Sequence, residues 1–259
     1  MGVNIKATSG PALEKAGDVA AILSNLEPYE ILFIDEAHRI NKLIEEVLYP
    51  ALETRKLHLI IGKGPSARTL SLDLPPFTVI AATTRASLLS NPLRSRFGAT
   101  FRLDYYKLED IEKIVERSAK LLNIKISKEA TKALAQSSRF TPRTANRLLK
   151  RSRDYAQVYK NDGIDETVVN KTLEMLEIDT LGLERPDREL LEIIIKKFNG
   201  GPVGLKALAA ASNEDLNTIE EMYEPFLMHT GLLHRTPLGR IATGPAYKHL
   251  NIQKSRALL

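Results

Sequence analysis

The sequence predicts an α/β domain followed by two smaller, mainly helical domains. Residues 30–35 and 77–84 are short, mostly apolar runs that end in polar residues, which is typical of buried parallel strands. From residue 107 onward, apolar residues recur mainly at helical spacing. The chain has 259 residues, which is enough for two or three domains with cores of their own.

Composition and charge narrow the classes of protein. The hydrophobic content of 43% is ordinary for a globular protein, and no apolar run reaches the roughly 18 residues of a membrane span. We therefore expect a cytoplasmic protein with no membrane association. The absence of cysteine excludes disulfides, thiolate zinc sites and cysteine nucleophiles. The net charge is +5, and the residues after Glu224 include five Lys or Arg and no acid. This favours a polyanionic partner, although a solvated basic surface fits equally well.

The first domain is expected to alternate helices with strands. Pro50 should end or kink the second helix. Two short strands flank Gly62-Lys63-Gly64-Pro65, which predicts a protruding hairpin. The expected elements are helices 11–26 and 41–52, and strands 30–35, 57–61, 69–74 and 77–84.

The rest of the chain predicts two further domains, separated by a linker at residues 179–186. Before the linker we expect only helices, and after it three helices followed by two extended runs. Three helices and a hairpin form a winged-helix arrangement, whose wing adds DNA contacts. The expected helices are 108–122, 128–138, 142–157, 166–176, 187–198, 203–211 and 214–228, and the extended runs are 231–235 and 239–243.

Two acids follow the first buried strand, in a Walker B pattern. Asp35 would hold Mg²⁺ through water, and Glu36 would orient the water that attacks the γ-phosphate of ATP. A strand that simply ends in two solvated acids is the plainer alternative. The phosphate-binding motif G-x-x-x-x-G-K-[ST] is absent, since the only Gly-Lys pair, at Gly62, lacks the other residues. We therefore expect the chain to begin inside an ATPase domain.

Three further positions have the chemistry of a nucleotide site. Thr84 ends the second sheet strand, where a hydroxyl could sense the γ-phosphate or simply satisfy the strand end. Arg94 and Arg96 lie at a turn before an expected strand, where one could be an arginine finger for a neighbouring subunit, or form a surface ion pair. Arg143 follows a Thr-Pro helix start, and a cation there opposes the helix dipole, which favours a phosphate partner.

Several segments, in this order, closely resemble the RuvB family, the bacterial Holliday-junction branch-migration motors of the AAA+ class. The resemblance covers essentially all 259 residues. The segments are ILFIDEAHR at 31–39, EEVLYPALE at 45–53, IGKGPSAR at 61–68, ATTR at 82–85, PLRSRFG at 92–98, TPRTANRLL at 141–149, YEPFL at 223–227 and RTPLGR at 235–240.

The resemblance implies a domain order and roles for individual residues. It implies a partial AAA+ P-loop-type sheet at residues 1–106, a small all-α AAA+ lid at 107–178 and a winged-helix head at 179–259. ATP and Mg²⁺ are the implied cofactors. The implied roles in hydrolysis are Walker B for Asp35, which is also the metal ligand, and for Glu36, sensor 1 for Thr84, sensor 2 for Arg143, and the trans-acting finger for Arg96 with Arg94 as its rival. Contacts near the nucleotide are implied for Glu53, Thr54, Arg55 and Tyr106, although the first three could equally form the last turn of a helix and Tyr106 could be a core residue at a domain hinge. DNA contacts are implied for the wing residues Arg235 and Arg240.

The implied function is ATP-driven branch migration in DNA recombination and repair by a homohexameric ring. The implied partners are the DNA of a Holliday junction, RuvA through the hairpin at 57–74, and RuvC in the resolving complex. The hairpin could equally be an ordinary sheet extension. Two positions depart from the family pattern, since Phe140 stands where Gly is usual and Ala37 where Ile is commoner.

Two other functions remain open at this point. Without a phosphate-binding loop the chain could be a nonhydrolysing module that binds DNA and RuvA. A clamp-loader-like subunit would share the Walker B and finger residues, but the predicted winged-helix end argues against it.

Overall fold

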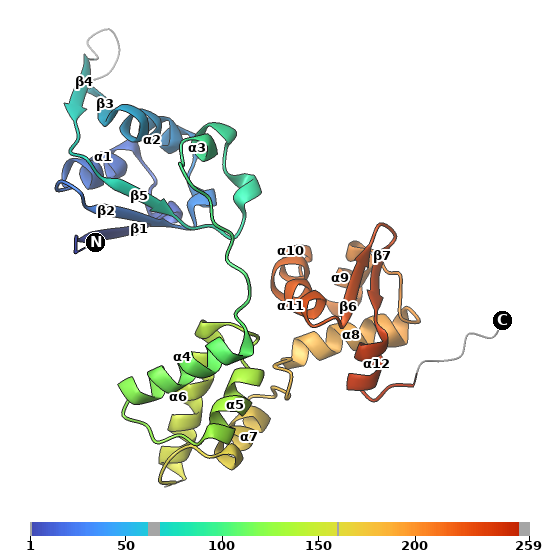
Figure 1. Ribbon diagram of the computed structural model, residues 1–259. Helices are drawn as coiled ribbons and strands as arrows, with labels where there is room; N and C mark the ends of the chain where they lie inside the picture. Colours follow the sequence, from blue (N-terminus) through green and yellow to red (C-terminus); the bar gives the residue numbers. More distant parts are fainter. Residues whose placement is uncertain (1, 62–67, 160, 254–259) are drawn as a thin grey trace. The chain divides into compact units, whose positions relative to one another are not determined.

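The computed structural model describes residues 2–61, 68–159 and 161–253 and divides the chain into two compact units, Met1–Arg102 and Leu103–Leu259 (Figure 1). The first unit contains a parallel sheet of strands β1 (Ile5–Ser9), β2 (Ile31–Asp35) and β5 (Thr78–Ala81), in the order β1-β2-β5. Ile31 of β2 pairs with Ile5 on one side and with Thr78 on the other. This confirms the predicted α/β sheet.

Two helices cover this sheet with apolar side chains. Helix α1 (Ala16–Ser24) and helix α2 (Lys42–Thr54) bury Leu23, Ile44 and Leu48 against Ile34 of β2. Helix α2 begins at Asn41, whose side chain accepts a hydrogen bond from the Ile44 N–H at 3.0 Å. The single-turn helices η1 (Gly10–Ala12) and η2 (Ala37–Arg39) follow β1 and β2.

Pro50 was predicted to end or kink the second helix, and it does not end it. Helix α2 continues through Pro50 to Thr54, and its last turn is closed by a hydrogen bond from the Thr54 hydroxyl to the Pro50 carbonyl at 2.9 Å. Proline removes only one backbone hydrogen bond, whereas the next turn is held by Ala51, which is fully buried. Packing therefore outweighs the local preference.

The predicted hairpin forms a separate two-stranded antiparallel sheet. Strand β3 (Lys56–Ile61) pairs with β4 (Arg68–Asp73), with Leu57 opposite Leu72 and Leu59 opposite Leu70. The residues that connect the two strands, 62–67, lie outside the described part of the chain. After β5 come η4 (Ala86–Leu88) and the short helix α3 (Asn91–Ser95). The strand expected after Arg96 does not form, because residues 97–107 contain neither helix nor strand.

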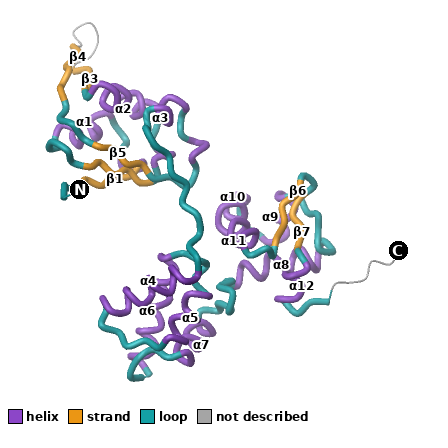
Figure 2. Tube along the Cα trace, viewed as in Figure 1, coloured by secondary structure: helices purple, strands orange, loops and turns teal. Residues whose placement is uncertain are grey.

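The second unit begins with four helices around one apolar cluster, and Figure 2 shows its strands confined to the later winged part. The cluster includes the fully buried Ile111, Leu134 and Leu148. Ser127 and Asp165 cap two of the helices by accepting hydrogen bonds from Ala130 N–H and Val168 N–H. The helices are α4 (Leu108–Leu121), α5 (Lys128–Gln136), α6 (Pro142–Val158) and α7 (Glu166–Met175).

The winged part has its own cluster, centred on Phe226 and Leu191. Its third helix, expected over 214–228, runs without a gap from Leu216 to His229 and contains a π-helical turn, and a terminal helix follows the wing. The elements are α8 (Arg185–Lys197), α9 (Leu205–Ser212), α10 (Leu216–Thr218), a π-helical turn η5 (Ile219–Tyr223), α11 (Glu224–His229), β6 (Leu233–Thr236), β7 (Gly239–Ala242) and α12 (Gly244–His249).

A short segment before α6 joins the four-helix part to the winged part. Arg139 lies 3.3 Å from Asp187 and has its guanidinium 4.4 Å from the centre of the Phe226 ring. Phe140 packs edge-on against His229, with ring centres 5.4 Å apart. Phe140 has a left-handed φ of 53°. This conformation is costly for a bulky residue, and it occupies the position where the resemblance leads one to expect glycine.

Candidate nucleotide site and DNA-binding wing

The carboxyl ends of β2 and β5 bring the strand-end residues together. Ala82 N–H donates a hydrogen bond to the Ile34 carbonyl, and Ala37 N–H donates one to the Ala82 carbonyl, both at 2.9 Å. Asp35 is exposed at this edge, and one of its oxygens accepts a hydrogen bond from the Glu36 N–H at 2.9 Å. One exposed carboxylate fits Mg²⁺, because this ion keeps several waters and takes other ligands from substrate phosphates. Among the described residues there is no larger cluster of acids and histidines that could hold a metal.

Glu36 adopts a left-handed conformation, with φ 47°, and turns its side chain toward His38. Its Oε2 atom is buried, has no hydrogen-bond partner within the described residues, and lies 3.3 Å from His38 Nδ1. The same nitrogen lies 2.9 Å from Thr83 Oγ1, which also accepts a hydrogen bond from Arg85 N–H. His38 therefore connects the second acid to the end of β5.

The expected sensor threonine, Thr84, is exposed in the bend after β5. Its neighbour Thr83 makes the contact with His38. The hydroxyl of Thr84 is thus placed at the sheet edge and open to a ligand. Its role as sensor 1 stays a prediction.

Arg96 is held by groups of its own unit. Its guanidinium lies 2.9 Å from Glu53 Oε1, donates to the Pro92 carbonyl at 2.7 Å and covers the Tyr49 ring at 4.4 Å. The structure thus brings together two residues of the predicted site, Glu53 and Arg96. Sequence reasoning missed Tyr49, which lies four residues before Glu53 on α2 and is recognisable only once α3 is placed. Arg94 is exposed and donates to Asn91 at 3.2 Å.

The remaining predicted nucleotide residues lie at helix ends and in the segment before α4. Thr54 ends α2, and Arg55 caps it with a left-handed φ of 56°. The Tyr106 N–H donates to the Phe140 carbonyl, and the Tyr106 side chain is exposed. Arg143 is exposed in the first turn of α6. Their nucleotide contacts stay predictions.

Thr141 occupies the N-cap position of α6 without capping it. Its hydroxyl contacts the Ser138 carbonyl at 3.2 Å and the Thr144 hydroxyl at 2.9 Å, and makes no capping bond to a backbone N–H. The predicted helix start is correct, since Pro142 is its first residue. The first-turn N–H groups, beside Arg143, are not taken by this side chain.

The wing places its two arginines side by side but not in the acid-free setting that the sequence suggested. Arg235 pairs with Arg240 across strands β6 and β7. The acids Glu220 and Glu224, from η5 and α11, lie against both of them. The expectation of an acid-free wing was wrong, because the third helix of the winged part returns its acids to the hairpin.

Arg240 is buried, with only 7% of its surface exposed, whereas an arginine that contacts DNA directly is expected to be exposed. Its Nε donates to Glu224 Oε1 at 2.6 Å and its Nη2 donates to Glu220 Oε1 at 3.1 Å. Burial opposes the charged form, but the hydrogen bonds and charges of Glu224 and then Glu220 outweigh it and raise the pKa of Arg240. The side chain of Arg240 thus ties the wing to α11.

Arg235 differs from Arg240 because its side chain is 51% exposed. Its Nη2 lies 3.1 Å from Glu220 Oε1, and its Nη1 lies 3.7 Å from Glu224 Oε2. Of the two arginines predicted to bind DNA, Arg235 is the more exposed.

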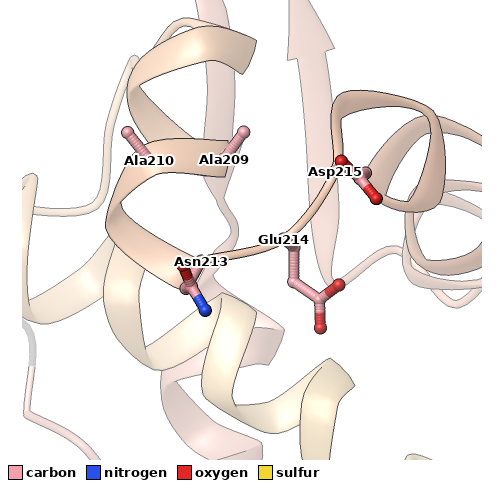
Figure 3. A pocket seen from close by; sticks show the side chains of 5 residues that line it. All are labelled: Ala209, Ala210, Asn213, Glu214 and Asp215. Carbon is pink, nitrogen blue, oxygen red and sulfur yellow. The ribbon is translucent and has the colours of Figure 1, made fainter.

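A shallow pocket of about 340 Å³ lies where α9 leads into α10 (Figure 3). It is lined by Ala209, Ala210, Asn213, Glu214 and Asp215. Two carboxylates and no cation line it, so phosphate would be repelled. This pocket is therefore unsuited to a nucleotide. No helix in the described part of the chain is long and apolar enough to cross a membrane.

A parallel sheet with acids at a strand end, a four-helix domain and a winged-helix domain together define an AAA+-type protein with a winged-helix head. The chain belongs to the RuvB family. Residues 1–103 match the Holliday junction DNA helicase RuvB P-loop domain, residues 106–179 the RuvB AAA lid domain, and residues 180–251 the RuvB C-terminal winged helix domain.

Solved structures agree with this assignment. The Thermotoga maritima RuvB Holliday junction branch migration motor is 48% identical, with a TM-score of 0.83 over 96% of this chain and 79% of that chain. A point variant of the same protein has a TM-score of 0.85 at 47% identity, covering 97% of this chain and 80% of that chain. The Aeropyrum pernix ORC2 protein, 16% identical with a TM-score of 0.53 over 96% of this chain and 78% of that chain, shares the fold alone.

Proposed function

We propose that this chain is a motor subunit that uses ATP to migrate Holliday junctions, as part of a homohexameric ring acting with RuvA in DNA recombination and repair. The observation that carries the proposal is the 48% identity to the Thermotoga maritima motor over 96% of the chain. The three matched family domains, in their order, support the same conclusion. We expect the protein to work in the cytoplasm.

The spacing of substituted residues in the Thermotoga structures supports two site assignments. One variant replaces a threonine and another an arginine, and these two positions are twelve residues apart. Thr84 and Arg96 are also twelve residues apart. An alanine variant two residues before that threonine corresponds to Ala82, and a proline variant 58 residues after it corresponds to Pro142. This spacing favours Arg96 over Arg94 as the finger.

The proposed chemistry at the sheet edge is hydrolysis of the γ-phosphate of ATP. Asp35 would hold Mg²⁺ through water, and the bound ion would neutralise charge on the phosphates. Glu36 would orient the attacking water with one carboxylate oxygen, while His38 holds the other from behind. Thr84 would contact the γ-phosphate from the adjacent strand end.

Arg96 would act on the nucleotide of a neighbouring subunit. A guanidinium that meets the developing charge of the transferred phosphoryl group accelerates hydrolysis by about 10³ to 10⁵ in known cases. In the isolated chain Glu53 holds this group, so the proposed finger exchanges a carboxylate for a phosphate when the ring assembles. Thr54, Arg55, Tyr106 and Arg143 are proposed as further nucleotide contacts.

The wing and the hairpin at 57–74 are the proposed binding regions for DNA and for protein partners. Arg235 is proposed to bind DNA phosphates, whereas the role of Arg240 is proposed to be support of the wing. The hairpin at 57–74 is proposed to bind RuvA, and its exposed Leu70 offers apolar surface for this contact. RuvC, in the resolving complex, is a further proposed partner.

ATP binding and turnover test the motor proposal. Titration calorimetry of the chain with Mg²⁺-ATP should give micromolar binding, and Glu36→Gln should keep binding but lose turnover. Arg96→Ala should abolish hydrolysis at a concentration where wild type hydrolyses, whereas Arg94→Ala, its matched comparison, should not. Normal turnover in Arg96→Ala would remove that residue from the reaction.

A further inference from the structure

Four charged side chains form a closed cluster at the base of the wing. Glu220 Oε1 lies 3.1 Å from Arg235 Nη2 and 3.1 Å from Arg240 Nη2. Glu224 contacts the same two arginines, at 3.7 Å and 2.6 Å. Two guanidinium groups and two carboxylates have no net charge, so the cluster attracts DNA less than two free arginines would.

Two of the four ion pairs of this cluster differ most in exposure, Glu224 with Arg240 and Glu220 with Arg235. Glu224 and Arg240 have side chains only 2% and 8% exposed, so separating them would leave a buried charge. The side chains of Glu220 and Arg235 are 35% and 51% exposed. Exposed ion pairs are weak and exchange their partners readily. The first pair is therefore a fixed support, and the second is an exchangeable contact.

We propose that Glu220 shields Arg235 in the free protein, because its carboxylate occupies the guanidinium that a DNA phosphate would bind. Carboxylate and phosphate oxygens accept hydrogen bonds from the same face of a guanidinium group. DNA binding therefore requires Arg235 to exchange Glu220 for a phosphate. This inference rests on the proposed DNA-binding function of the wing and deepens it.

Shielding has a direct consequence for a protein that moves along DNA. A wing whose arginine returns to an internal carboxylate releases each phosphate more easily than a wing with a free arginine. Because an exposed pair is weak, we expect the carboxylate to reduce affinity by about threefold to fivefold at low salt. The effect should shrink as salt screens the charges.

The test is the affinity of the full chain for a fluorescently labelled duplex of random sequence, measured by anisotropy over a range of salt concentrations. Glu220→Gln should tighten binding about threefold to fivefold at low salt. Glu221→Gln is the matched control, since it removes the same charge from an exposed position on the same turn. It should change affinity by less than about twofold.

A double variant separates shielding from a general charge effect. In an Arg235→Ala background, Glu220→Gln should no longer tighten binding, because the shielded group is gone. Glu220→Ala provides a second variant that also removes the carboxylate, and thermal melting checks that each protein is folded.

Three results would overturn the proposal. Binding by Glu220→Gln that is unchanged or weaker than wild type would make Glu220 a support for Arg235. An equal gain in Glu221→Gln, or a gain that persists without Arg235, would point to net charge alone. If Arg235→Ala weakens binding while Glu220→Gln has no effect, only the shielding fails; if Arg235→Ala binds like wild type, the proposed DNA-binding wing fails as well.

Discussion

Replacing Arg240 by alanine should destabilise the winged part much more than replacing its exposed neighbour. The change leaves Glu224, only 2% exposed, without the guanidinium that lies 2.6 Å away. Breaking a buried ion pair from one side costs about 3 to 5 kcal/mol. Arg235 remains 3.7 Å from Glu224 and compensates in part, so we expect about 3 kcal/mol. Arg235→Ala, at an exposed pair, should cost less than about 1 kcal/mol.

Amide hydrogen exchange is the appropriate assay, because a chain of several domains has no single unfolding transition. A loss of about 3 kcal/mol raises the open population about 100-fold, and exchange in β7 and α11 should accelerate by that factor. Exchange in α4–α7 should stay unchanged. Replacing both partners, as Glu224→Leu with Arg240→Met, should recover most of the loss. An Arg240→Ala protein as stable as Arg235→Ala would refute the idea that Arg240 is a support.

Three further predictions concern other positions. Burial raises the pKa of the Asp187 carboxyl, although the charge of Arg139 opposes this shift. The stability that this shift contributes is therefore fully present below the ordinary pKa of an aspartate and is lost as pH rises through the raised pKa. Hydrogen-exchange protection of α8 in Asp187→Asn should therefore gain on wild type as pH rises through that window, and the opposite trend would contradict the burial argument. At Phe140, with its left-handed φ, Phe140→Gly should be more stable than Phe140→Ala by about 1 kcal/mol in hydrogen exchange of α6, the reverse of the usual order. Asn41→Ala should cost about 1 kcal/mol by loss of its helix cap, measured by hydrogen exchange in α2, and unchanged exchange there would rule the cap out.

The sequence predicted most of the helices and strands because their signals are local. Four apolar residues before Asp35 predict a buried strand, and a parallel sheet then places that acid at the edge near Thr84. The Thr-Pro pair before Arg143 likewise predicts the start of α6. These inferences need only neighbours along the chain. Pro50 shows their limit, since packing of the following turn overrides a local preference.

The contacts that give the candidate sites their character are nonlocal and could not be predicted in this way. The tie between Arg96 and Tyr49 joins residues far apart in sequence, as does the contact between His38 and Thr83. At the wing, counting charges after Glu224 suggested a basic surface. Folding brings that acid itself back against the hairpin, because α11 packs on β6 through the buried Phe226 and Leu233.

The π-helical turn η5 contains one residue more than the regular α-helical turn that it replaces. The additional residue is absorbed locally, so the helix keeps its register on either side of the turn. Deleting one residue of η5 would therefore restore a regular α-helix and leave α11 facing the wing. Deleting one residue within α11 would instead rotate the residues after it by about 100° around the helix axis. A single-codon deletion should thus be tolerated in η5 but not in α11.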